Sequence, residues 1–433
     1  MLAVRRMRHP TRRTTSALKE NRFQHFFANL GPGLITGAAD DDPSGISTYS
    51  VAGAAFGYLP LWTAVLSFPL MTAVQLMCAR LGLVTGLGLA GVIRRRYAPW
   101  VLWSACTLLV VANVINIAAD LGGMAEATAM VIGTPVALMV PVYGVAIVSL
   151  LMWSSYRSIA RVFKWLTLVL LAYVLTAFVA GVDWRRALQA TIVPHMEFSR
   201  AFFSVLVAIL GTTISPYLFF WQAAQEVEEE RAKGRNLARR GATRAELAAC
   251  RTDVATGMFA SNAIMYFIIM TTAATLHAHG RTNIATAQQA AEALRPLAGA
   301  GAYWLFTLGL IGTGVLAVPV LAGSCAYAIA EASAWRGSLD RPPGRAKKFY
   351  FVLAVAMALG IALNYAGLNA IRLLFTTAVI NGVLAPPLIL IVLLLTGDRT
   401  VMGGAVNSRT LALLGWLAFA VMVVAALGLL FAS

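Results

Sequence analysis

The chain has 433 residues, of which 59% are hydrophobic and only 12% are charged, and its mean hydropathy is +0.75. This composition excludes an ordinary soluble domain and indicates an all-α polytopic membrane protein. The net charge of +16 does not indicate nucleic-acid binding, because the basic residues lie in short clusters between apolar runs rather than in one patch.

Eleven apolar runs are long enough to cross a bilayer as helices. They lie near 30–56, 59–81, 99–121, 134–156, 163–182, 199–223, 253–276, 303–330, 350–367, 372–396 and 411–432. A basic tail occupies 1–29, and basic clusters recur in alternate connections, at 94–96, 157–164, 233–244 and 341–348. By the positive-inside rule, we expect a cytoplasmic N-terminus and an external C-terminus. We expect the membrane to be a bacterial-type plasma (inner) membrane.

The first run is interrupted by an acidic sequence, in which Asp40, Asp41 and Asp42 precede Pro43. A carboxylate facing lipid costs about 2.5–3.5 kcal/mol on insertion scales, so three in a row would be poorly tolerated. Pro43 removes a backbone donor, and Gly45 favours non-helical backbone. These features predict a helix broken midway, with its unwound turn facing a water-accessible site inside the protein. The alternative is an ordinary loop outside the membrane.

The sixth run contains a second interruption, where Thr212, Thr213, Ser215 and Pro216 divide a long apolar segment. A simple proline kink is the alternative interpretation. Two breaks, each opening a block of five runs, predict two inverted five-helix repeats at 30–182 and 199–396. A cytoplasmic loop and an eleventh helix, at 397–433, would follow the second repeat.

Unwound segments of this kind expose carbonyl groups and helix ends. The side chains of the unwound residues then determine which ligand binds there. The aspartates would repel an anionic substrate and attract a cation. Carboxylate and hydroxyl oxygens are ligands for hard cations. We predict Asp42, directly before Pro43, as the first ligand. Asp41 is a weaker second ligand and Asp40 a group in the vestibule, since successive helical side chains point in different directions.

Several sequence segments resemble landmarks of the NRAMP divalent-metal transporters over nearly all eleven runs. GPGLITGAADDDPSGI is similar to the first-helix pattern of that family, in which GPG precedes an Asp-Pro-Gly-Asn metal motif. ARLGLVTG, AADLG, RTD and LLLTGDRTVMG follow in the family's order and spacing. The resemblance implies a LeuT-type fold with broken helices 1 and 6, and transport of a divalent metal by alternating access.

The resemblance also implies a ligand set. The family's metal aspartate falls on Asp42, a carbonyl ligand falls on Ala39, and the motif asparagine is replaced by Gly45. In the sixth run the family's Ala-x-x-Met pattern falls on Thr212, which would offer its carbonyl, and on Ser215. A hydroxyl thus replaces the soft methionine sulfur, which favours iron, manganese and cadmium over magnesium. We therefore expect a magnesium-type branch whose cargo is magnesium, manganese or iron.

Three further substitutions concern proton coupling and a ligand in the tenth run. The family's histidine becomes Tyr217, and its glutamine falls on Ala378, for which Asn381 is a candidate substitute or an interhelical hydrogen-bonding residue. Its span-three aspartate is Asp120, but the acidic residue three positions later is Gly123. Loss of two relay groups implies weak or absent proton coupling.

Arg251 and Asp253, near the start of the seventh run, are either a structural ion pair or part of the relay. The acidic sequence at 225–230 is expected to be a solvated cap at the end of the sixth run, with regulatory metal binding as the alternative.

The alternative function is a LeuT-fold transporter of an amino acid or another organic substrate, against which the aspartates argue. The sequence has no HExxH motif, phosphate loop or Ser/His/Asp constellation, so we expect no enzyme activity. We expect no cofactor beyond the transported metal, no nucleic acid, and the lipid bilayer as the main partner.

Overall fold

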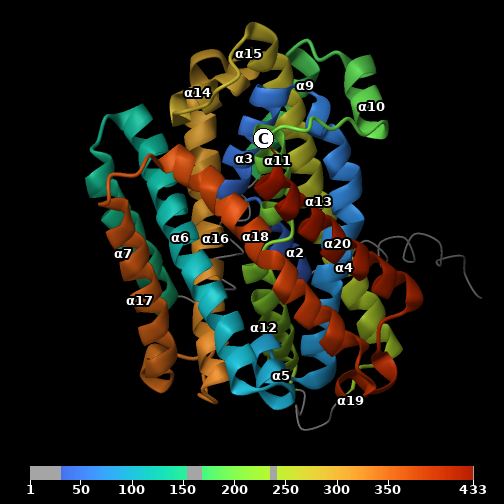
Figure 1. The fold of residues 1–433 in the computed structure, drawn as a ribbon. Coiled ribbons are helices and arrows are strands. Elements are labelled where there is room, and N and C mark those ends of the chain that lie inside the picture. Colours follow the sequence, from blue (N-terminus) through green and yellow to red (C-terminus); the bar gives the residue numbers. More distant parts are fainter. Residues whose placement is uncertain (1–30, 154–167, 235–240, 433) are drawn as a thin grey trace, which may run out of the picture.

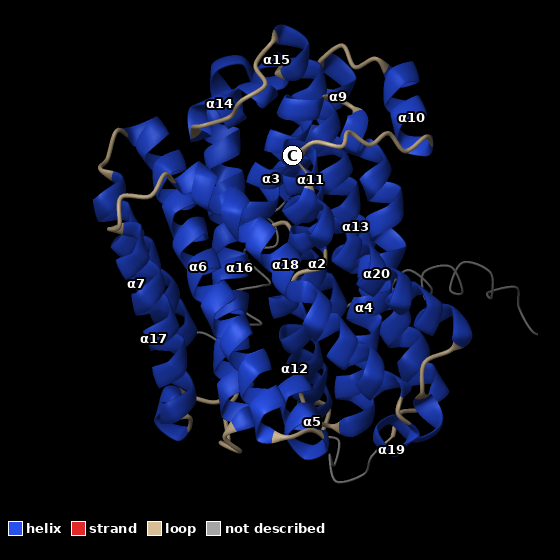
Figure 2. Ribbon diagram, viewed as in Figure 1, coloured by secondary structure: helices blue, strands red, loops and turns tan. Residues whose placement is uncertain are grey.

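A computed structural model describes residues 31–153, 168–234 and 241–432, and this part of the chain is helical with no strand (Figures 1 and 2). The long helices run side by side as one bundle. Short helices α5 and α19 lie at one end, while α10, α14 and α15 lie at the other, where the described chain also ends (Figure 1). The all-α prediction is confirmed.

Several helices, among them α6 and α13, extend beyond the predicted runs, and short helices connect the long ones. In chain order they are α2 (Pro32–Asp40), α3 (Pro43–Phe56), α4 (Trp62–Thr85), α5 (Leu89–Arg96), α6 (Pro99–Ile132), α7 (Val136–Trp153), α9 (Leu171–Val179), α10 (Trp184–Ile192), α11 (Arg200–Thr213), α12 (Pro216–Ala232), α13 (Arg244–Thr275), α14 (Ala287–Ala291), α15 (Arg295–Ala298), α16 (Ala302–Ala332), α17 (Lys347–Asn364), α18 (Ala370–Gly397), α19 (Arg399–Met402) and α20 (Arg409–Phe431).

Within the described residues, nine helical segments are long and apolar enough to cross a membrane, and they correspond to predicted runs two to four and six to eleven. The first predicted run is the pair α2 and α3. Part of the fifth run lies outside the described residues. Its end, α9, bends by 116° into α10, a short helix that the sequence analysis did not predict.

The first break has a local cause. Asp42 is in extended backbone, with φ −69° and ψ 170°, as expected of a residue that precedes proline. Pro43 then begins α3, and the Asp42 carboxylate caps that helix by accepting a hydrogen bond from the Gly45 amide at 2.6 Å. The predicted broken helix is confirmed, with α2 ending at Asp40.

The second break repeats this arrangement. Ser215 is extended, with φ −74° and ψ 129°, and Pro216 begins α12. Unlike Asp42, Ser215 does not cap the following helix, because its hydroxyl donates back to the carbonyl groups of Gly211 at 2.9 Å and Thr212 at 2.6 Å. Two chain breaks therefore occur, as predicted, at residues that precede proline.

Close backbone contacts fix the positions of the two broken helices. A Cβ atom at Gly37 of α2 would overlap the backbone of Gly257 on α13, and one at Gly211 of α11 would overlap Gly382 on α18. Glycine therefore lets each half-helix before a break approach its neighbour at backbone distance. These contacts fix α2 against α13 and α11 against α18.

Candidate metal centre

The centre of the site is a contact between the two breaks. The hydroxyl of Tyr217, the second residue of α12, donates to the Ala39 carbonyl at 3.0 Å and lies 3.4 Å from Asp42 Oδ2. Asp42 Oδ1 is occupied by the Gly45 amide, so Oδ2 is the oxygen left for a ligand. Asp42 is 2% exposed, and the site is closed to solvent in this conformation.

Residues of the second break lie directly beside this carboxylate. A Cβ atom built at Gly45 would be 3.2 Å from Thr212 Oγ1 and 3.4 Å from Asp42 Oδ1, so both oxygens flank the same glycine. Thr212 and Ser215 are both buried. The Thr212 carbonyl accepts a hydrogen bond from the Ser215 hydroxyl. The carbonyl oxygen of Thr212 and the hydroxyl oxygen of Ser215 each keep a lone pair that a cation could use.

The other two aspartates face a different helix. The Ser261 hydroxyl of α13 lies 2.6 Å from Asp40 Oδ2 and 3.1 Å from Asp41 Oδ1. Asp40 is fully buried in this closed conformation, and its role as a vestibule group stays a prediction. The three carboxylates therefore do not converge, because the chain turns between them. The role of Asp41 as a second ligand stays a prediction.

Asp120, on α6, is the other buried carboxylate near this centre. It is fully buried and interacts electrostatically with Asp42, and neither of its oxygens has a hydrogen bond of normal geometry within the described residues. At Gly123, a Cβ atom would meet the Leu374 side chain at 2.8 Å, so this position faces α18. The described surroundings of Asp120 therefore offer it neither of the two relay groups that the resemblance implied.

The ion pair considered for Arg251 and Asp253 is wrong. Asp253 accepts hydrogen bonds from the backbone amides of Gly31 at 2.8 Å, Gly33 at 2.6 Å and Leu34 at 3.1 Å, while the Arg251 side chain is exposed. A carboxylate at the amide end of a helix satisfies unpaired donors and favours the helix dipole. Asp253 is therefore the cap of α2.

On α18, the polar side chain that contacts the first break is Thr377 and not Asn381, the residue expected from the sequence. Ser44 donates to the Leu374 carbonyl at 2.8 Å and lies 3.2 Å from Thr377 Oγ1. Asn381 is buried one turn further along, and Ala378 contributes no polar side chain. Sequence reasoning missed Thr377, whose signal was a polar residue one turn before Asn381 on the same helix face.

A second missed group links the two broken helices beyond the site. Thr36 of α2 donates to Gln222 Oε1 of α12 at 2.5 Å, and Gln222 Nε2 donates to Glu226 at 3.0 Å. Gln222 is fully buried in the sixth run. An amide in the middle of an apolar segment was the available signal, since such a group needs a buried partner.

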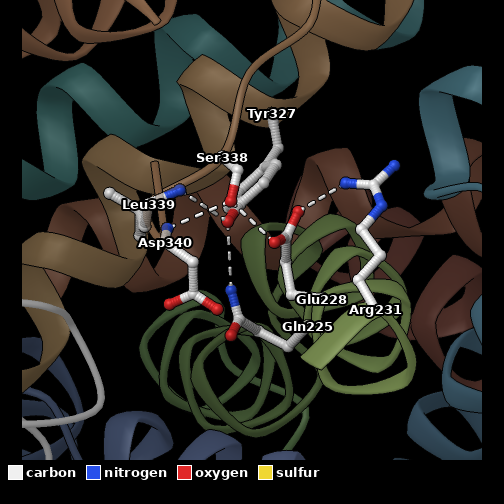
Figure 3. A network of polar contacts seen from close by, with 7 residues as sticks. All are labelled: Gln225, Glu228, Arg231, Tyr327, Ser338, Leu339 and Asp340. Atoms are coloured by element: carbon white, nitrogen blue, oxygen red, sulfur yellow. Dashed lines mark hydrogen bonds and ion pairs between the residues drawn. The ribbon is translucent and has the colours of Figure 1, made fainter. Parts of the chain in front are cut away.

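The acidic sequence at 225–230 is not a solvated cap. Glu226, Glu228 and Glu230 are each 6% exposed. Figure 3 shows Glu228 between Arg231, at 2.7 Å, and the Ser338 hydroxyl, at 2.6 Å. Tyr327 adjoins them and accepts a hydrogen bond from the Leu339 amide at 3.1 Å. The acidic residues therefore join α12 to the segment that follows α16.

The donor set at the breaks is one carboxylate with carbonyl and hydroxyl oxygens. Nowhere in the described ranges do three or more His, Cys, Asp or Glu side chains come together as a metal cluster. The C-terminal ends of α2 and α11 both meet the site, and helix C-termini attract cations. The arrangement suits a cation that keeps part of its water shell rather than one caged by the protein.

Two broken helices that meet at a buried carboxylate, within a bundle of membrane-spanning helices, define a helical membrane protein of the LeuT type. Mhp1, a nucleobase-cation-symport-1 family transporter in a closed conformation, has a similar fold (TM-score 0.57, 15% identity, 92% of this chain and 90% of that one). The similarity is higher for the Eremococcus coleocola manganese transporter, solved with an aromatic bis-isothiourea compound (TM-score 0.73, 20% identity, 94% and 86%).

The family pattern described as Nramp, natural resistance-associated macrophage protein-like, matches residues 33–432, and the chain belongs to this family. Its relatives include the divalent metal cation transporter MntH of Aeromonas hydrophila, which is 27% identical over 403 residues, covering 90% of this chain and 91% of the relative. The family and the LeuT-type fold expected from the sequence are confirmed.

Proposed function

We propose that the protein transports divalent metal cations by alternating access, with Asp42 as the central ligand. The observation that supports this most is the meeting of Asp42, the Ala39 carbonyl and Thr212 at two facing helix breaks. The MntH name of the relatives supports the same class of cargo. An organic anion is disfavoured, because it would face a buried carboxylate without a compensating cationic side chain among the residues that we describe at the site.

We infer that the cargo is magnesium or manganese rather than a soft metal. The positions at which the family has methionine and asparagine are Ser215 and Gly45 here, so the available ligands are hard oxygens. Gly45 also leaves room between Asp42 and Thr212. Magnesium retains several waters and binds through one or two carboxylates, which agrees with this small donor set. Iron remains the third candidate.

Proton coupling is weak or absent in this proposal. Tyr217 stands in place of a titratable histidine, and Gly123 in place of an acidic residue. Asp120 then lacks the neighbours needed to pass on a proton. Transport would follow the metal gradient and the membrane potential in a bacterial inner membrane, with the N-terminus cytoplasmic.

The test is uptake of magnesium, manganese and calcium into proteoliposomes of the full chain, with internal pH recorded at the same time. We expect magnesium and manganese uptake without stoichiometric acidification. A positive interior should oppose uptake by about 2.3 kcal/mol per charge per 100 mV. Acidification in proportion to metal uptake would refute uncoupled transport, and failure to move any divalent ion would refute the function itself.

A further inference from the structure

A large cavity lies away from the metal centre, on the outside of the bundle. It is a groove of about 1140 Å³ between α4, α13 and α20, three helices that lie on the same side of the molecule (Figure 1). None of the residues at the two breaks lines it. From its position and charge, we propose that this groove binds one anionic phospholipid.

The charge of the groove is one-sided. Its described lining contains Arg80, Arg244 and Arg251, and no acidic residue. Arg244 and Arg251 are exposed and lie two turns apart on one face of α13. Guanidinium groups bind phosphate through paired hydrogen bonds, and basic pockets between membrane helices are suited to acidic headgroups. The arginines define the headgroup end of the site.

Away from the arginines, the groove is lined mainly by apolar side chains, with several hydroxyl side chains among them, and it reaches Phe68 and Phe259. Small residues Ala248 and Ala255 follow the arginine face of α13. Phe259 meets Phe68 of α4 with ring centroids 5.8 Å apart and planes at 80°. This aromatic pair forms the far end of the groove, so the lining changes from cationic to apolar along one direction, as an amphiphile requires.

The length of the groove matches one leaflet. From Arg244 to Phe259 the helix rises about 22 Å, and from Phe68 to Arg80 it rises about 18 Å. Half of a bilayer with its headgroups is about 20–22 Å thick. A phosphate at the arginines would therefore place the acyl chains along Ala255 and end them at the phenylalanine pair.

Arg80 has a structural part in this site. Its guanidinium donates to the Ala405 carbonyl at 2.7 Å, the Val406 carbonyl at 3.2 Å and Asn407 Oδ1 at 3.3 Å. These bonds hold the segment before α20 against α4 and so form one wall of the groove. Arg244 and Arg251 are the better targets for substitution, because their exposed side chains can change with little effect on folding.

The experiment measures binding of phosphatidylglycerol to the purified full chain by native mass spectrometry, with phosphatidylcholine of the same acyl chains as the neutral probe. We expect one preferred phosphatidylglycerol. Arg244→Gln combined with Arg251→Gln should weaken its binding by about 10- to 30-fold, from the usual contribution of a basic residue near acidic lipid. The matched control, Arg341→Gln with Arg345→Gln, removes two exposed charges outside the groove and should leave binding unchanged.

A second variant tests the apolar half. Ala255→Trp fills the groove without changing its charge and should also reduce lipid retention, while the melting temperature reports on folding. Equal losses in the two arginine pairs would show general surface electrostatics and overturn the proposal. Unaltered retention in Ala255→Trp, or displacement of the lipid by inorganic phosphate alone, would overturn the assignment of the groove to a lipid.

Discussion

Tyr217→Phe is the most informative single change at the metal centre. The Tyr217 hydroxyl donates to the Ala39 carbonyl at 3.0 Å and lies 3.4 Å from Asp42 Oδ2, so it occupies the space between two predicted metal ligands. A cation that binds both oxygens must displace this hydroxyl. Loss of the hydroxyl then removes a hydrogen bond from the metal-free protein and nothing from the metal-bound protein.

The magnitude follows from that hydrogen bond. A buried carbonyl left without its donor costs about 1–1.5 kcal/mol, at the lower end of the range for unsatisfied groups, and the weak 3.4 Å contact with Asp42 adds little to this cost. Only the metal-free state bears this cost, so manganese should bind about 5- to 10-fold more tightly to Tyr217→Phe. Release should slow, and turnover should fall.

The assay is manganese binding by calorimetry, with uptake measured on the same preparations. Tyr173→Phe is the matched control, because Tyr173 is an equally buried tyrosine on α9 that belongs to neither break. Its manganese affinity should equal that of the unmodified protein. An unchanged or weaker affinity in Tyr217→Phe would refute the idea that this hydroxyl competes with the cation.

Three other substitutions test the site, the cap of α2 and one ion pair. Ser215→Met adds a thioether beside Asp42, so cadmium should compete more strongly with magnesium uptake, by about 1–2 kcal/mol of relative affinity; an unchanged cadmium inhibition constant would remove Ser215 from the site. Asp253→Ala removes the acceptor of three amide bonds at the start of α2 and should cost about 2 kcal/mol, seen as a lower melting temperature; equal melting would contradict the capping role. Hydrogen bonds from Thr400, and then the Arg96 charge at 2.8 Å, lower the pKa of Asp398, so its stabilisation is present above the ordinary aspartate pKa of about 3.9 and is lost as pH falls below it. Asp398→Asn should therefore melt below the unmodified protein at pH 7, and the difference should shrink as the pH falls through the lowered pKa of the folded carboxylate; a difference of the same size in acid would contradict this assignment.

The two helix breaks could be predicted because their causes are local. Asp42 and Ser215 each precede a proline, and such residues avoid helical backbone wherever they lie in the fold. The position of Asp42 directly before Pro43 thus predicted its extended backbone, whereas its role as a metal ligand stays a prediction. The sequence predicted that the two breaks meet only through the interpretation of two inverted repeats, and that interpretation rests on the same two prolines.

Contacts between distant segments could not be predicted in this way. The acidic residues at 225–230 have the composition of a solvated face, yet Glu228 is buried by Ser338, which lies 110 residues later in the chain. Asp40 and Asp41 face Ser261, about 220 residues away. A local sequence pattern shows that burying a carboxylate is costly, but it does not show which distant donor offsets that cost. The surroundings of these carboxylates could therefore be seen only in the folded structure.

The most direct test of the account is metal transport by Asp42→Ala. Manganese binding and uptake are measured in proteoliposomes beside Asp183→Asn, which neutralises an exposed aspartate that caps α10 far along the chain. We predict that Asp42→Ala folds, as judged by its melting temperature, but neither binds nor transports manganese, while Asp183→Asn behaves like the unmodified protein. Uptake by Asp42→Ala at a near-normal rate would contradict the placement of the cation at the two helix breaks.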